Sequence, residues 1–379
     1  MPRDYIRRRR IRRTAINSFV VAVLGATLAW VIMRQPATPS FGISTPDQHI
    51  AASALGDGAE KTARYSRGYP FVAGRYPLQE IADAAIHDAN RNVDIHARLL
   101  VPKIPGRYPV IIFSPDRDNS TTCCEALSRN WASQGYAIVQ LIRPEVREEV
   151  RPGTLETVRF KQEIKNRPGA GQAASAALDI TSIIDALPVL PTRFPEIRGK
   201  LDTAHVGVAG HGFGAVAAEA IGGALLDVPG HPRSNLADPR VRAVVCISPQ
   251  GPGRSGLTEQ SFDQFPLPYL GVTGDGDPAP GKYAAMAWHK APFLRSQPEE
   301  KYELFVHRDD GTAARDAGPL SPVSAEGNRE PSAPTSVYME GTTLAFWDAY
   351  LKHDVAAKSY LRSDALQKAS NGEVSLEKR

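Results

Sequence analysis

A glycine-rich turn between a short apolar strand and an Ala-rich helix is the segment of this chain best suited to carry chemistry. It reads Gly210-His211-Gly212-Phe213-Gly214. A turn of this layout, G-x-S-x-G, presents a nucleophilic serine at a helix N-terminus, where backbone N–H groups stabilise an oxyanion. Here the central residue is Gly212, which has no side chain to attack a carbonyl. The layout of a nucleophile is therefore present without the nucleophile.

Alternating strands and helices are expected to hold this turn. From about residue 76, apolar runs indicate strands, and Ala-rich or amphipathic stretches indicate helices. Strands are predicted at 93–101, 109–113, 136–142, 206–209, 241–247, 269–273 and 302–306, and helices at 121–134, 173–187, 215–225 and 342–351. This alternation predicts an α/β fold with a mostly parallel central sheet and helices on both faces. A charged, irregular stretch at 145–167 is predicted as an insertion near the carboxyl edge of the sheet.

Six segments, in the right order, resemble the α/β-hydrolase superfamily. The similarity is to the branch of dienelactone-hydrolase-like and platelet-activating-factor-acetylhydrolase-like esterases, and it runs through most of positions 85–365. The segments are 108–114, 131–139, 201–210, 248–251, 274–277 and 344–352. The resemblance implies an α/β-hydrolase fold and, for an active member, attack on short-acyl or acetyl esters.

Carried over residue by residue, the resemblance implies that only one member of a Ser-His-Asp triad is retained. Asp277, which follows the predicted strand 269–273, stands at the position of the acid. The position of the nucleophile falls on Gly212, and that of the histidine falls on Gly311. His307 comes a few residues earlier, at the end of a predicted strand. The triad is therefore expected to be incomplete.

The loop that should help to form an oxyanion hole also departs from the family pattern, which is typically Ser-His-Gly followed by glycines. Here it reads Ser114-Pro115-Asp116-Arg117-Asp118-Asn119. The resemblance puts Asp116 where an oxyanion forms, and its negative charge has the wrong sign for stabilising one. The Phe213 backbone N–H remains as one donor. Glycine at 212 also relieves backbone strain of about 1–3 kcal/mol that other residues bear at such a turn.

No cofactor or metal site is predicted. Gly210, Gly212 and Ala215 also fit the dinucleotide fingerprint G-x-G-x-x-A, but the acid needed at the end of the next strand is missing at Ser248. Seven further histidines show no spacing typical of metal ligands. They are His49, His87, His96, His205, His231, His289 and His353.

The chain has three cysteines, too few for a disulfide scaffold. Cys123 or Cys124 could replace the missing serine, with His211 or His307 as the base. The alternative for both is a small buried residue at the start of a helix, and His211 has the alternative of a packing residue. A disulfide from one of the pair to Cys246 is an option in an oxidising compartment.

The N-terminus is predicted to anchor the chain in a membrane. Residues 1–13 are rich in arginine, and the apolar segment 14–33 spans about 28 Å as a helix, close to the thickness of a bilayer core. An uncleaved signal anchor is favoured over a cleaved signal or a twin-arginine signal, because no A-x-A-like cleavage site follows. The positive-inside rule then places the globular domain outside the cytoplasm, in the periplasm or the extracellular space.

The body of the chain is slightly acidic, although the net charge of the whole is +4. Eight arginines and a single acid in residues 1–34 account for the excess, so the body shows no charge pattern typical of nucleic-acid binding. With 42% hydrophobic residues it can bury a large core. Residues 34–75 are predicted as a linker, 76–365 as the α/β-hydrolase domain and 366–379 as a polar tail.

These observations favour a membrane-anchored pseudohydrolase that binds a small acyl-ester or lipid-like ligand, or a protein partner, through the former active site. Two alternatives stay open. One is a carboxylic-ester hydrolase with an unusual nucleophile, which differs from the first hypothesis in turning its substrate over. The other is a structural or interaction protein that retains only the fold, and it differs in lacking a ligand pocket.

Overall fold

The computed structural model describes residues 68–71, 74–116, 124–142, 169–275, 277, 285–307 and 333–379. They all belong to the second of two compact units of the chain, Asp57–Arg379. The predicted Arg-rich segment, the anchor at 14–33, most of the linker, the 145–167 insertion and Gly311 lie outside the described residues. Among the helices that are described, none combines the length and the apolar character needed to cross a membrane.

Among the described residues, nine strands form a single sheet in the order β1-β2-β4-β3-β5-β8-β9-β10-β11. Their bounds are β1 Leu78–Asp88, β2 Val93–Pro102, β3 Tyr108–Ser114, β4 Ala137–Ile142, β5 Leu201–His211, β8 Val241–Ile247, β9 Tyr269–Gly274, β10 Lys301–Val306 and β11 Val374–Lys378. The consecutive strands β4, β3, β5, β8, β9 and β10 run parallel to one another. Strands β1, β2 and β11 pair antiparallel. The predicted α/β class with a mostly parallel sheet is confirmed.

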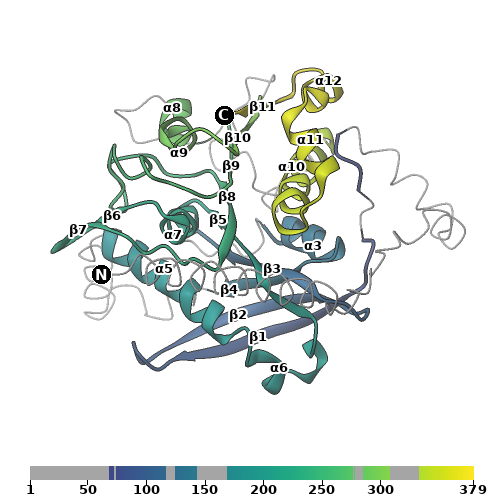
Figure 1. Ribbon diagram of the computed structural model, residues 1–379, viewed down its shortest axis with the longest axis vertical. Coiled ribbons are helices and arrows are strands. Elements are labelled where there is room, and N and C mark those ends of the chain that lie inside the picture. Colours follow the sequence, from purple (N-terminus) through teal and green to yellow (C-terminus); the bar gives the residue numbers. More distant parts are fainter. Residues whose placement is uncertain are drawn as a thin grey trace, which may run out of the picture. The chain divides into compact units, whose positions relative to one another are not determined.

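Helices cover both faces of the sheet (Figure 1). In β3, for example, Val110 and Ile112 face one buried cluster, and Ile111 and Phe113 face the other. Such strands are apolar on both sides, so both sides must be covered. One face carries α5 (Gly169–Ala186), α7 (Phe213–Gly222) and α9 (Ala291–Arg295), and the other carries α3 (Glu125–Ser133), α10 (Ala333–Leu351), α11 (Val355–Arg362) and α12 (Ala365–Ser370). The shorter elements are α6 (Leu190–Arg193), η1 (Pro195–Ile197), α8 (Ala285–His289) and the hairpin of β6 (Leu226–Val228) and β7 (His231–Ser234).

The two outermost strands were not predicted from the sequence. Strand β1 has the composition LQEIADAAIHD, in which small and charged residues mask the alternation. Residues 366–379, predicted as a polar tail, instead form most of α12 and all of β11, which pairs with β10. Val374 and Leu376 alternate with polar residues and bury their side chains against the core. A single apolar face on an edge strand explains why the composition of this segment looks polar.

The end of the predicted linker is fastened to the domain by Asp348 of α10. The Tyr69 hydroxyl donates to Asp348 Oδ2 at 3.0 Å, and the Tyr136 hydroxyl donates to Oδ1 at 2.7 Å. The Lys352 ammonium lies 2.9 Å from the same Oδ1. Burial, together with the Asp348 charge, raises the pKa of Tyr136 well above its usual value. Burial and the Asp348 charge raise the pKa of Tyr69 as well, so both tyrosines remain donors. The Tyr69 bond holds residues 68–71 against α10.

Candidate functional site

The strand order reverses between β3 and β5. After β3 the chain places β4 on one side of it and β5 on the other. In open α/β sheets, ligands bind beyond the carboxyl ends of the strands at such a switch point. Asp116, Gly212, Ser248 and Asp277 follow the ends of β3, β5, β8 and β9, which are consecutive strands in the sheet. These four residues therefore define the candidate site.

Gly212 makes the turn from β5 into α7, with φ +54° and ψ −111°. This left-handed region favours glycine. The Gly212 N–H donates to the Ile247 carbonyl at 2.9 Å, which ties the turn to β8. Gly214, in the first turn of α7, permits a close approach, because a Cβ there would lie 2.0 Å from the Ser114 carbonyl oxygen of β3. The backbone therefore requires both glycines, whatever the chemistry of the site.

The Asp116 side chain fills the space in front of Gly212. Its Oδ1 accepts a hydrogen bond of 2.9 Å from the Phe213 N–H, the donor that remained for an oxyanion. A Cβ on Gly212 would lie 2.3 Å from Asp116 Oδ2. A carboxylate is favourable at this position because the first N–H groups of a helix are unpaired and carry partial positive charge. Asp116 thus takes the place of a nucleophile's side chain, and of the phosphate in the dinucleotide interpretation.

Asp277 is buried beyond the end of β9, with 4% of its surface exposed. Its Oδ1 accepts from the Ser248 hydroxyl at 2.8 Å. Its Oδ2 accepts from the Thr273 hydroxyl at 2.6 Å and from the Gly274 N–H at 3.2 Å. A triad acid accepts from a histidine ring instead. The three donors on Asp277 include no histidine, and they fasten the chain that follows β9 to the end of β8.

Ser248 is the member of the site that sequence reasoning missed. The segment 248–251 belongs to the family resemblance, but the resemblance assigns no role to its serine. Ser248 has φ +47°, an uncommon left-handed conformation for a residue other than glycine. Its N–H donates to the Val272 carbonyl at 2.8 Å, which places the hydroxyl beside Asp277. A serine directly after an apolar strand is the one sequence signal that could have indicated it.

Neither His307 nor His289 donates to Asp277. His307 follows β10, as predicted, and its Nε2 lies 3.0 Å from the Ser375 hydroxyl of β11, on the side of β10 opposite to β9. His289, at the end of α8, is buried, and its Nδ1 lies 2.6 Å from the Pro249 carbonyl oxygen. Because a carbonyl only accepts, Nδ1 carries the hydrogen. Gly311, the predicted histidine position, lies outside the described residues.

Cys124 and Cys246 are buried and belong to clusters on opposite faces of the sheet, and they are not bonded to each other by a disulfide. The Cys246 thiol lies 3.6 Å from the Ala215 carbonyl oxygen, and burial raises its pKa well above the usual value, so it remains neutral. Cys124 immediately precedes α3 and is 3% exposed, as expected for a small residue that starts a helix. Cys123 lies outside the described residues.

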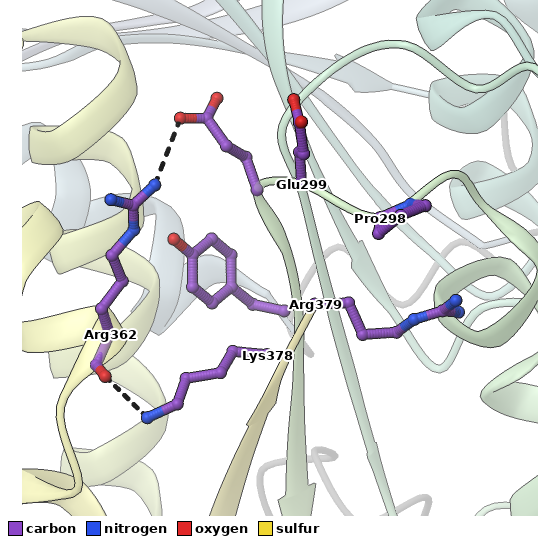
Figure 2. Close-up of a pocket in the computed structure, with 7 residues that line it drawn as sticks. Pro298, Glu299, Arg362, Lys378 and Arg379 are labelled. Carbon is purple, nitrogen blue, oxygen red and sulfur yellow. Dashed lines mark hydrogen bonds and ion pairs between the residues drawn. The ribbon is translucent and has the colours of Figure 1, made fainter.

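A separate cavity of about 530 Å³ lies at the opposite end of β10, where that strand begins. Figure 2 shows its lining, which consists of Pro298, Glu299, Glu300, Tyr302, Arg362, Lys378 and Arg379. The charged groups of this cavity largely face other protein groups. Arg362 lies 3.9 Å from Glu300, and the Lys378 ammonium donates to the Arg362 carbonyl at 2.6 Å. The cavity is therefore distinct from the candidate site and offers little free charge to a ligand.

Comparison with protein-family models and with curated proteins gives no match for this chain. Within the described parts of the chain, no group of three or more His, Cys, Asp or Glu side chains is placed to hold a metal ion. The geometry at the four strand ends is therefore the basis for a function.

Proposed function

We propose that this chain is an α/β-hydrolase-fold protein that has lost ester hydrolysis and binds a small acyl-ester or lipid-like ligand at the former active site. The observation that carries the proposal is the Asp116 carboxylate, which accepts from the Phe213 N–H in front of Gly212. Nucleophilic catalysis needs a reactive side chain at the turn and free donors for the oxyanion. Here the central position of the turn, Gly212, has no side chain, and the Phe213 N–H is already engaged by an anion.

The arrangement of the site supports the fold family named in the proposal. A strand leads into a tight turn and then into a helix at the carboxyl edge of a mostly parallel sheet, which is the setting of a nucleophile elbow. The turn also lies at the switch point of the sheet, where ligands of α/β proteins bind. Binding at this place requires neither Gly212 nor Asp277 to take part in a reaction.

The full chain is expected to hydrolyse p-nitrophenyl acetate, butyrate and octanoate no faster than buffer alone. Loss of triad residues can still leave about 10³–10⁴-fold catalysis over water from the oxyanion hole and binding. Because Asp116 accepts from the Phe213 N–H, this residual activity is expected to be lost as well. The measurement is the initial rate of p-nitrophenolate release at increasing protein concentration.

Two variants make this assay decisive. Ser248→Ala removes the hydroxyl that donates to Asp277, and Asp277→Asn removes the carboxylate. The Ser248–Asp277 hydrogen bond favours a second candidate function, a hydrolase in which Ser248 is the nucleophile. A rate proportional to protein concentration and lost in Ser248→Ala would establish that function instead. Without turnover, saturable binding of non-hydrolysable acyl ethers separates a ligand-binding protein from one that keeps only the fold.

We also propose that residues 14–33 anchor this domain to a membrane, with the domain outside the cytoplasm. The full chain is expected to stay with the membrane fraction after carbonate extraction, and a chain starting at residue 68 is expected to be released. Protease added outside intact cells or spheroplasts should digest the anchored domain. Recovery of the full chain in the supernatant, with an N-terminus beyond residue 33, would indicate a cleaved signal instead.

A further inference from the structure

Two glutamate side chains are fully buried on the face of the sheet that carries α5, α7 and α9, and the proposed function uses neither of them. Glu219 belongs to α7 and Glu303 to β10, and each is 0% exposed. The Tyr269 hydroxyl donates to Glu219 Oε1 at 3.4 Å. Glu219 Oε2 and both carboxyl oxygens of Glu303 have no hydrogen-bond partner among the residues that the structure describes. Three unpaired buried oxygens are unusual and need an explanation.

The backbone of β9 is shaped to admit the Glu303 side chain. Gly271 pairs with Glu303 in the sheet, and a Cβ on it would lie 2.0 Å from Glu303 Oε2. On its other side Gly271 pairs with Cys246 of β8. The Cys246 thiol in turn lies against α7, 3.6 Å from the Ala215 carbonyl oxygen. The carboxyl group of Glu303 is therefore held over the sheet, on the face that α7 covers.

The groups around Glu303 do not neutralise a charge on it. Burial is the main cause that raises its pKa well above the usual value. Lys290, which precedes α9, opposes this shift, whereas Glu377 of β11, Asp277 after β9 and Glu219 of α7 add to it. The Lys290 ammonium itself pairs with Glu377 at 2.5 Å. Glu303 is therefore held as a neutral carboxylic acid.

Glu219 is in a similar state. Burial raises its pKa well above the usual value, and hydrogen bonds from Tyr269 of β9 and Cys246 of β8 reduce the shift only in part. No cation on these elements contributes to the shift. An ionised carboxylate without a partner in an apolar interior is strongly unfavourable. Glu219 and Glu303 are thus two neutral acids in the layer between the helices α7 and α9 and the strands β8, β9 and β10.

We propose that Glu219 and Glu303 form a pH-sensitive switch, in which the packing of α7 and α9 on β8, β9 and β10 requires both acids to be protonated and loosens when they ionise. Each acid has a higher pKa in the folded state than in the unfolded chain. Each protonated acid therefore contributes its full stabilisation below the pKa of the unfolded chain, near 4.5. This contribution is lost as the pH rises toward the higher pKa of the folded state. For each acid, the unfolding equilibrium constant rises by up to about tenfold per pH unit over that range.

The loosening is expected to reach the candidate site, because Glu219 and Phe213 belong to the same helix. When α7 moves from the sheet, the Phe213 N–H moves away from Asp116, which belongs to the segment after β3. The switch therefore sets the pH range in which Asp116 keeps its hydrogen bond to the Phe213 N–H. It holds whether or not the protein hydrolyses esters, so its failure would leave the proposed function intact.

Cys246 offers a local probe, since its thiol lies within the packing of α7 on β8. In the full chain with Cys123→Ser and Cys124→Ser, Cys246 is the remaining thiol. Its rate of reaction with a disulfide reagent such as dithionitrobenzoate is expected to rise more steeply than the roughly tenfold per pH unit of thiolate formation alone. With Glu303→Gln added, the labelling rate of Cys246 should rise by only about tenfold or less per pH unit. Near pH 9, this labelling rate should be at least about tenfold lower than without the substitution.

Thermal unfolding of the chain with all its cysteines gives an independent readout. The midpoint of the wild type is expected to fall steadily from about pH 6 to about pH 9, and that of Glu303→Gln to fall much less. Glu196→Gln serves as the matched control, because Glu196 is exposed and lies in the short helix η1. Glu219→Gln should act in the same direction as Glu303→Gln. Coincident pH profiles for the wild type and both glutamine variants, in labelling and in unfolding, would overturn the proposal.

Discussion

Replacing Gly212 by serine is expected to destabilise the protein by roughly 3–5 kcal/mol and to restore no esterase activity. A Cβ at this position would lie 2.3 Å from Asp116 Oδ2, which is well inside van der Waals contact. The backbone angle of +54° adds strain for any residue with a side chain. The serine hydroxyl would also reach a carboxylate rather than a histidine. Urea denaturation of the variant and the wild type measures the loss.

The second half of this test is the double variant Gly212→Ser with Asp116→Gly. Removing the carboxylate opens the space for the serine side chain, so the two substitutions should be coupled by about 1–3 kcal/mol in a double-mutant cycle. Asp116→Gly alone removes an anion from a helix N-terminus and is expected to cost about 1 kcal/mol. Gly171→Ala in α5, where a Cβ meets nothing within 4 Å, controls for glycine replacement and should be neutral or stabilising.

Additive effects of the two substitutions would contradict the view that Asp116 occupies the nucleophile's place. Strong coupling would support it, and would also explain why the two residues occur together. A side chain at 212 is incompatible with a carboxylate capping α7, and a glycine there leaves the helix N-terminus open to such a carboxylate. Under the proposed function, the glycine at 212 and the aspartate at 116 are then one structural change rather than two independent ones.

The strands at the centre of the sheet could be predicted from the sequence because they are apolar on both sides. Within β3 and β8, the segments Pro109–Phe113 and Ala243–Ile247 are continuous hydrophobic runs, as expected for strands covered on both faces. The edge strands Leu78–Asp88 and Val374–Lys378 escaped prediction because only one of their faces is buried. In Val374–Lys378 the polar side chains outnumber the buried apolar ones, so the sequence predicts a polar tail there.

The candidate site was predictable only where backbone geometry constrains residue types. The glycines at 210, 212 and 214 showed the tight turn directly. The contact between Asp116 and the Phe213 N–H joins residues 97 positions apart, and the bond between Ser248 and Asp277 joins residues 29 apart. Neither pair follows a local pattern, since each depends on how neighbouring strands end in the sheet. The negative charge of Asp116 could be recognised in the sequence, whereas its place at the N-terminus of α7 could not.

Replacing Asp348 by alanine is expected to destabilise the protein by about 2–4 kcal/mol. The carboxylate accepts from the hydroxyl of the fully buried Tyr136 at 2.7 Å and from that of Tyr69 at 3.0 Å. It also lies 2.9 Å from the Lys352 ammonium. Alanine leaves the Tyr136 hydroxyl without this acceptor in a place that water does not reach, and a buried unpaired donor is costly. Thermal and urea unfolding of the full chain measure the effect.

The matched variants separate the role of Asp348 in the core from its role in holding the linker. Asp348→Asn keeps an acceptor for Tyr136 and should lose about half as much stability as the alanine variant. Tyr69→Phe removes the bond to residues 68–71 alone, and should cost about 1 kcal/mol while speeding proteolysis just before residue 74. Equal proteolysis of Tyr69→Phe and the wild type would mean that the linker is held by other contacts, such as the ring of Tyr360 at 5.3 Å.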